Sequence, residues 1–89
     1  MTMPGSSNDV LKLELKRLIV EACERDISPE FIADEAPLVG MHSALGLDSL
    51  DVLQLNTALL KRYGVRIEDG KHARRVMKTI NTLADFIEP

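Results

Sequence analysis

The sequence is poor in cysteine and in aromatic residues: its 89 residues include one cysteine, no tryptophan, one tyrosine and two phenylalanines. A single thiol cannot form an internal disulfide, and sparse cysteine use is typical of proteins from a reducing cytosol. No apolar run approaches the roughly 18 residues of a membrane span. Residues 1–7 lack the basic and apolar regions of a secretory signal, and their small, polar types predict a flexible tail. We therefore expect a cytoplasmic protein without a membrane span, folded as one domain over residues 8–89.

The sequence also lacks the residue groupings that catalysis requires, which are a nucleophile with a nearby base, a pair of tuned carboxylates or a metal site. His42 and His72 have no second ligand at metal spacing, and no glycine-rich phosphate loop is present. We therefore expect neither an enzyme nor a metal protein, with His42 facing solvent in a loop. Cys23 is interpreted as a buried or boundary residue; the alternative is a reactive thiol.

Charge is present in both signs but is distributed unevenly along the chain, whose formal net charge is −3. Residues 1–60 hold ten Asp and Glu against four Lys and Arg, whereas residues 61–78 hold seven Lys and Arg against two acidic residues. An acidic majority repels nucleic-acid phosphates, so we expect no nucleic-acid partner. The segregation of the charges favours electrostatic steering by a charged partner.

Apolar residues recur at helical spacing in four segments of the chain. The helices predicted from them span residues 8–25, 48–63, 71–77 and 80–88. Asn8 or Asp9 can cap the first helix. Gly64 is suited to end the second helix, and Thr79 can cap the last. The fold class predicted is all-α, a bundle of three longer helices and one short helix.

A long loop, residues 26–48, connects the first and second main helices, because this stretch shows no extended periodicity. Within the loop, the Ser-Pro-Glu sequence at 28–30 predicts a turn or two of helix that reaches about Asp34. Phe31 and Ile32 could then dock on the first helix. The loop is therefore predicted to be anchored to the core and not structureless.

The first helix carries one apolar stripe, whereas the second carries two. The stripe of the first helix consists of Leu11, Leu15, Leu18, Ile19 and Ala22. The second helix has one stripe of Val52, Leu55, Leu59 and Tyr63 and another of Leu50, Leu53, Thr57 and Leu60. One small domain does not bury both stripes completely, so we assign the former to the core and the latter mostly to the surface. The alternative is that the latter stripe packs under the long loop.

The start of the second helix combines a turn with an unusual pair of acidic residues around a serine. Asp48 can act as the N-cap, with Asp51 three residues later as the acidic partner of a capping box. Ser49 then lies in the first helical turn, pointing outward beside N–H groups that have no intrahelical partner. The positive end of the helix dipole favours an anion, so Ser49 is well placed to carry a phosphate ester. The alternative is an ordinary helix-start serine.

The stretch Leu-Gly-Leu-Asp-Ser-Leu-Asp-Val-Leu-Gln-Leu at 45–55 resembles the attachment sequence of the acyl carrier protein family. The order of segments is also similar over about residues 8 to 89, and the chain looks most like the specialised type II carriers of bacteria. The resemblance implies that Ser49 carries 4'-phosphopantetheine and that Asp48 is recognised by a phosphopantetheinyl transferase. It also implies an exposed docking face on the second helix, formed by Leu50, Leu53, Gln54, Thr57, Leu60 and Lys61.

Carriers of this family hold acyl groups as thioesters on an arm derived from coenzyme A and present them to other enzymes. The resemblance therefore implies a fatty-acid, polyene or polyketide-like pathway, with partners such as acyl-loading ligases and ketosynthases, and we expect a monomer. An aminoacyl or peptidyl carrier with the same arm is one alternative. A non-carrier helical module that grips a partner through Leu50, Leu53 and Leu60 is another.

The charge of the later helices departs from the pattern of fatty-acid-synthesis carriers, which are strongly acidic on the recognition helix and on the short helix after it. Here Lys61 and Arg62 close the recognition helix. The short helix is surrounded by Lys71, Arg74, Arg75 and Lys78. This departure argues against docking on the basic patch of fatty-acid synthase enzymes, and we hypothesise partners with mixed or acidic docking surfaces.

Overall fold

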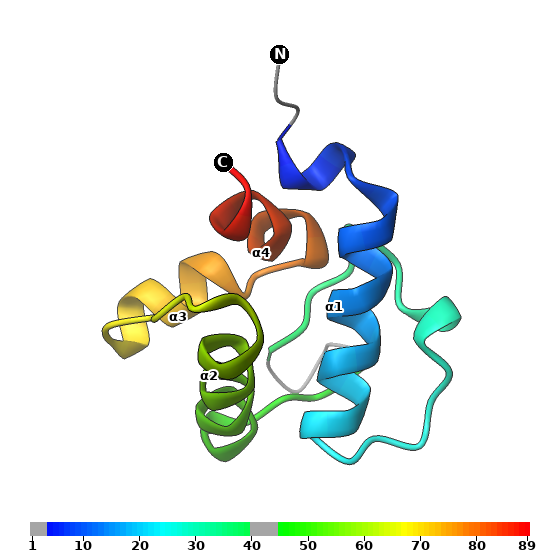
Figure 1. The fold of residues 1–89 in the computed structure, drawn as a ribbon. Helices are drawn as coiled ribbons and strands as arrows, with labels where there is room; N and C mark the ends of the chain where they lie inside the picture. The colour runs from blue at the N-terminus through cyan, green and yellow to red at the C-terminus, as the bar shows by residue number, and fades with distance from the viewer. Residues whose placement is uncertain (1–3, 40–44) are drawn as a thin grey trace.

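The computed structural model describes residues 4–39 and 45–89, and these residues form four α-helices. The helices are α1 (Asp9–Ala22), α2 (Ser49–Tyr63), α3 (Gly70–Val76) and α4 (Ile80–Ile87), with short 3-10 helices η1 (Gly5–Ser7) and η2 (Pro29–Phe31) before and after α1. Helix α1 packs against both α2 and α4, and α3 packs against α4 (Figure 1). The predicted all-α, four-helix fold class is confirmed. Among the described residues, no helix combines the length and apolarity needed to cross a bilayer.

One hydrophobic core lies between the helices and includes side chains from the long loop. Its fully buried large members are Leu15, Ile19, Leu38, Leu47, Leu55, Leu59, Met77, Ile80 and Leu83. The stripes predicted to face the core of α1 and α2 supply four of these residues, while Leu18, Val52 and Tyr63 lie half-buried at the stripe edges. Burial of apolar surface at helical spacing therefore decides which face of each helix points inward.

Side-chain caps determine where the helices begin. The Asn8 carboxamide accepts a hydrogen bond from the Leu11 amide, and Asp69 does the same for the His72 amide at the start of α3. Thr79 and Thr82 form a reciprocal capping box at the start of α4. These caps satisfy amides that have no intrahelical partner.

Helix α1 ends three residues before the predicted end at residue 25. The Arg25 amide donates to the Val20 carbonyl over 3.0 Å, the Glu24 amide donates to the Glu21 carbonyl over 3.4 Å, and Glu24 adopts a φ of 51°. This is the left-handed C-terminal cap that usually contains glycine. Because a glutamate occupies this position, no residue typical of a helix C-cap marks the end of α1 in the sequence.

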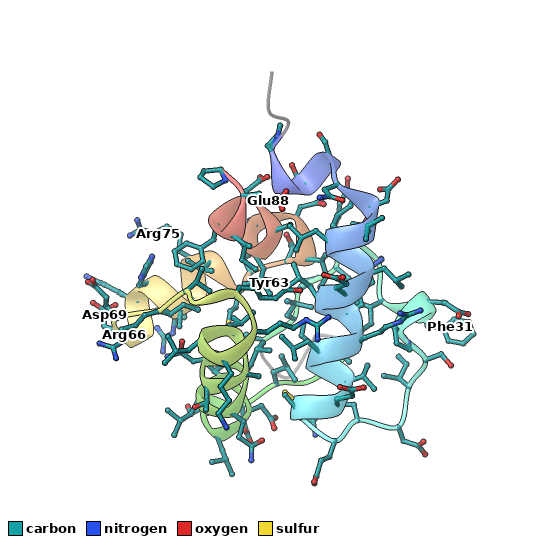
Figure 2. All side chains as sticks on the ribbon, in the orientation of Figure 1. Phe31, Tyr63, Arg66, Asp69, Arg75 and Glu88 are labelled. Atoms are coloured by element: carbon teal, nitrogen blue, oxygen red, sulfur yellow. The ribbon has the colours of Figure 1, made fainter. Side chains whose placement is uncertain are left out.

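The long loop is anchored at several points, but not by all of the predicted residues. Ile32 is 4% exposed and contacts the core, whereas Phe31 is 76% exposed and points away from the molecule in Figure 2. The prediction that Phe31 docks on the first helix is therefore wrong: η2 is a single 3-10 turn, and it turns only one of the two side chains inward. Val39 and Leu47 form an isolated parallel bridge that closes the two sides of the loop. His42, for which we expected a solvent-facing position in the loop, lies outside the described residues.

Residues 5–7 form a short helical turn that contacts the end of the chain. This turn is η1, which lies beside the C-terminal end of α4 (Figure 1). The Gly5 amide donates to the Glu88 carbonyl over 2.6 Å, and the Ser6 amide donates to the Asp85 carboxylate over 2.8 Å. A Cβ atom on Gly5 would lie 1.9 Å from the Ala84 carbonyl oxygen, so the close approach requires glycine. Both partners of these contacts come from the far end of the chain, so the local composition of residues 5–7 does not reveal them. The flexibility of the tail over residues 1–7 stays a prediction.

Candidate functional site

Ser49 is the first residue of α2 and its side chain is exposed. The helix begins there because Asp48 and Asp51 form a reciprocal capping box. The Asp51 amide donates to Asp48 Oδ1 over 2.9 Å, and the Asp48 amide donates to Asp51 Oδ2 over 3.1 Å. The predicted capping box is confirmed. Ser49 is therefore an exposed residue at the positive end of a 15-residue helix.

The two acidic residues of the box occupy different environments. Asp48 is exposed, and the hydrogen bond that its carboxylate receives from the Asp51 amide holds the pKa of Asp48 below its usual range. It is therefore ionised at neutral pH and presents a negative charge to solvent directly before Ser49. Asp51 is buried, with a relative exposure of 8%, and needs a partner for its charge.

Arg25 supplies that partner and links the end of α1 to the start of α2. Its guanidinium forms an ion pair with the Asp51 carboxylate. Its Nε donates to the Leu45 carbonyl over 3.0 Å, and a terminal nitrogen lies 3.5 Å from the Gly46 carbonyl oxygen. One side chain thus holds the turn before Ser49 against the capping box. Sequence reasoning missed this role, because no spacing rule connects Arg25 to a residue 26 positions away.

Cys23 lies next to this link and is buried, with 4% exposure. Its thiol sulfur is 3.7 Å from the Asp51 carbonyl oxygen. Burial raises the pKa of the Cys23 thiol to about 11, and the nearby Asp51 charge adds to the effect. The thiol is therefore protonated at neutral pH, which confirms the interpretation of Cys23 as a buried residue and not a reactive thiol.

A groove of about 580 Å³ runs beside Ser49 between α2 and α3. Its apolar lining includes Val39, Leu47, Val52, Ile67 and Ala73. Polar residues stand along it as well: Asp48, Ser49, Asn56, Glu68, Asp69 and Arg74. The Asn56 side chain bonds both the amide and the carbonyl of Ile67, which fixes the segment between α2 and α3 along the groove. A volume of this size falls in the range of small-molecule sites, so a flexible group attached at Ser49 has space beside it.

The residues predicted to form a docking face are exposed on the outer side of α2. These residues are Leu50, Leu53, Gln54, Thr57, Leu60 and Lys61. Leu50 and Leu53 are each 62% exposed and Leu60 is 43% exposed, so the alternative that this stripe packs under the long loop is wrong. Exposed apolar side chains that lie together on one helix face make that face a candidate contact surface. Their docking role stays a prediction.

The described residues bring the predicted attachment residues together but contain no grouping for a metal. Ser49 and Asp48 share one end of α2 and one edge of the groove, with Leu53 also in its lining. No cluster of three or more His, Cys, Asp or Glu side chains suited to hold a metal ion occurs in the part of the chain that the structure describes. The exposed hydroxyl, the adjacent carboxylate and the groove fit a serine that is modified by another protein.

Comparison with known proteins agrees with this geometry. No curated protein matches the sequence. A family profile described as "Phosphopantetheine attachment site" matches residues 13–87, which include every α-helix in part or in full. A match over most of the chain identifies the family and its prosthetic group. The chain therefore belongs to the phosphopantetheine attachment-site family, whose members are carrier proteins for 4'-phosphopantetheine.

Proposed function

We propose that Ser49 is the residue that carries 4'-phosphopantetheine and that the chain is an acyl carrier protein. The observation that carries the proposal is the exposed position of Ser49 at the first residue of α2, on the edge of the groove. The family match supports the attachment of the group to this chain, and Ser49 stands in the Asp-Ser-Leu sequence typical of that attachment.

Each residue around Ser49 has a defined task in this proposal. The start of α2 stabilises the negative phosphodiester that attachment creates, because helix amides and the helix dipole favour an anion there. Asp48 offers an ionised carboxylate for recognition by the phosphopantetheinyl transferase. Arg25 and Asp51 hold the turn and the helix start in place. When attached, the arm supplies a terminal thiol that holds acyl groups as thioesters.

The exposed face of α2 is the proposed docking surface for the partner enzymes. Leu50, Leu53 and Leu60 form its apolar part, and a partner that covers them gains free energy by removing apolar surface from water. We propose acyl-loading ligases and ketosynthases of a fatty-acid, polyene or polyketide-like pathway as these partners, with the chain acting as a specialised type II bacterial carrier. Tethering then raises the effective concentration of the acyl group at each enzyme.

The test is modification by a phosphopantetheinyl transferase with coenzyme A, followed by intact-mass measurement. The wild-type chain should gain the mass of one phosphopantetheine, and Ser49→Ala should gain none. Ser28→Ala is the matched control, because Ser28 is also an exposed serine before a helical turn, and it should be modified like the wild type. An unmodified wild type across several broad transferases would contradict the proposal and favour a non-carrier helical module.

The cargo is tested separately. The modified protein is incubated with acyl-activating ligases and with adenylating enzymes that activate amino acids, and loading is followed by intact mass. We expect loading with carboxylic acids that lack an amino group. Selective loading with amino acids would instead identify an aminoacyl or peptidyl carrier.

A further inference from the structure

The side of the molecule around α3 is covered with cationic side chains that have no anionic partner among the described residues. The surface consists of Arg66, Lys71, Arg74, Arg75 and Lys78, all of them exposed. No ion pair in the described part of the chain includes any of these five residues. Figure 2 shows Arg66 and Arg75 projecting from this side, away from η2 and Phe31. We call these five residues the cationic surface.

The cations elsewhere in the chain are mostly used within the fold, which makes the cationic surface distinct. Lys12 and Lys16 form ion pairs with Asp34, and Arg25 forms one with Asp51. Around α3, by contrast, the Asp69 carboxylate is occupied as the cap of the helix. Cations in the last turn of a helix are favoured by its dipole, but the effect is weak at an exposed position and concerns Arg74 and Arg75 alone. The accumulation of five unpaired cations therefore has no explanation within the fold.

The cationic surface is continuous with the candidate site. Arg74 lines the same groove as Ser49, from the α3 side. On the α2 side, the exposed residues after Ser49 are apolar, with Leu50 and Leu53 each 62% exposed. The carboxylate of Asp51 is buried, so Asp48 is the acidic residue that α2 and its cap expose at this end. A protein that approaches Ser49 thus meets an apolar patch from α2 and, on the α3 side of the groove, Arg74 together with the exposed Glu68 and Asp69. Residues 66–78 hold five Lys and Arg against these two acidic residues, so the charge beside the patch is positive on balance. An apolar core with a charged rim is the arrangement of a protein interface.

We propose that the enzymes acting on the group at Ser49 dock through an acidic surface that covers the cationic surface of this chain. The inference rests on the proposed function, since it assigns the partner that reaches the same serine. Complementary charge steers the encounter and suppresses partners whose own surface is basic. A protein fits better than a nucleic acid or an anionic membrane, because the remaining chain has an acidic excess and the leucines of α2 need an apolar patch opposite them.

The experiment compares two forms of one probe enzyme that differ only in the sign of their docking charge. The probe is a ketosynthase of fatty-acid synthesis, used with its natural basic docking patch and with the Lys and Arg of that patch replaced by Glu. Binding of the phosphopantetheine-modified protein is measured by titration at low and at moderate salt. We expect the acidic form to bind at least about tenfold more tightly, and the difference to shrink as salt screens the charges.

A matched pair of charge reversals tests which surface is responsible. Arg75→Glu and Arg17→Glu change the net charge equally, and both arginines are exposed and form no ion pair within the described residues, but Arg17 lies on α1. Arg75→Glu should weaken binding to the acidic ketosynthase by roughly two- to thirtyfold, since it turns an attraction into a repulsion. Arg17→Glu should change it by less than about twofold. Thermal melting verifies that each variant folds, and Lys78→Glu replaces Arg75→Glu if that variant does not.

Several results would overturn the inference. They are tighter binding to the natural basic ketosynthase, equal or absent binding to both forms, and equal weakening by the two reversals. Tighter binding to vesicles of phosphatidylserine and phosphatidylcholine in equal parts, or to a DNA duplex, would assign the surface to a different class of partner and overturn it too. The titrations are repeated with unmodified Ser49→Ala, whose charge preference should persist. A failure of Ser49 modification therefore contradicts the proposed function, whereas a reversed charge preference contradicts only the docking inference.

Discussion

At the level of single residues, the carboxylates of Asp48 and Asp51 beside Ser49 have different roles. Asp51 is buried against Arg25 and has a structural task. Asp48 caps the helix with one oxygen while remaining exposed and ionised. These two tasks of Asp48 can be separated by mutation, because asparagine caps helices as well as aspartate but carries no charge.

We predict that Asp48→Ala and Asp48→Asn separate stability from recognition. Asp48→Ala should lower Tm by several degrees, because the Asp51 amide loses its acceptor. Asp48→Asn should keep Tm close to that of the wild type but lower kcat/KM for phosphopantetheinyl transfer. Thermal melting and a transferase assay measure the two effects. If Asp48→Asn were modified as fast as the wild type, the carboxylate charge would have no role in recognition.

Cys23 should be unreactive in the folded protein at pH 8. Its pKa is raised to about 11 and its sulfur is buried, so the thiolate is scarce and shielded. The protonated Cys23 thiol contributes fully to the stability of the fold below its unfolded pKa of about 8.5. This contribution is lost as the pH rises through the folded pKa of about 11. Alkylation by iodoacetamide, followed by mass spectrometry, should therefore be slow in buffer and fast in guanidinium chloride. Rapid alkylation of the native protein would mean that the cysteine is accessible.

The sequence predicts the residues around Ser49 better than the contacts that support them. The Asp48 cap and the outward serine follow from local rules, because both depend on residues within one helical turn. The link from Arg25 depends on where the chain brings α1 and α2 together, and local rules do not contain that information. The exposed position of Phe31 was missed for the same reason.

At the level of elements, the end of α1 and the start of α2 act as one unit through Arg25. The Arg25 side chain is 31% exposed and the Asp51 side chain is 11% exposed, so removing the arginine leaves a largely buried carboxylate without its countercharge. The carbonyls of Leu45 and Gly46 lose their donor at the same time. The turn before Ser49 would then be less tightly held.

We predict that Arg25→Ala lowers the free energy of unfolding by about 2 kcal/mol and also reduces kcat/KM for transfer to Ser49. Arg17→Ala is the matched control, since this arginine on α1 is exposed and has no ion pair in the described residues; it should change stability by less than about 0.5 kcal/mol. Urea denaturation and the transferase assay measure the two effects. A loss in Arg25→Ala no larger than that in Arg17→Ala would show that the link contributes nothing.

Helix boundaries were predictable where a residue type marks them. Asn8, Thr79 and Gly64 mark three ends correctly, and Gly64 adopts the left-handed φ of 69° expected of a helix-ending glycine. The end of α1 was predicted three residues too late, because Glu24 adopts the same left-handed conformation although it is not a glycine. Where the residue at a helix end is not a typical cap, the packing around it determines where the helix ends. The local sequence pattern contains no information about that packing.

At the level of the whole molecule, the loop and the chain ends are fastened by polar contacts between distant segments. Asp34 joins the loop to α1 through Lys12 at 2.9 Å and Lys16 at 2.7 Å. The hydrogen bonds from Lys16 and Lys12 hold the pKa of Asp34 below its usual range. Periodicity predicted the buried helix faces, but it could not predict these contacts or the docking of η1, because their partners lie far apart in the chain.

The Asp34 contacts should make stability depend on pH in the acidic range. A carboxylate whose folded pKa is lowered stabilises the fold above its unfolded pKa of about 4. This stabilisation is lost as the pH falls through the folded pKa. We predict that Asp34→Asn lowers Tm at pH 7 and that the Tm difference from the wild type shrinks as the pH falls below the unfolded pKa of about 4. Glu35→Gln, at the exposed neighbouring position, should follow the wild type throughout. A constant Tm difference at all pH values would argue against an ionic role for Asp34.

Top-down mass spectrometry of the protein isolated from its own cells tests directly whether Ser49 carries 4'-phosphopantetheine. We expect to find one phosphopantetheine, with or without an acyl group, and fragmentation should place it on Ser49. An unmodified polypeptide, or a phosphopantetheine on any other residue, would contradict the assignment of Ser49 as the attachment residue.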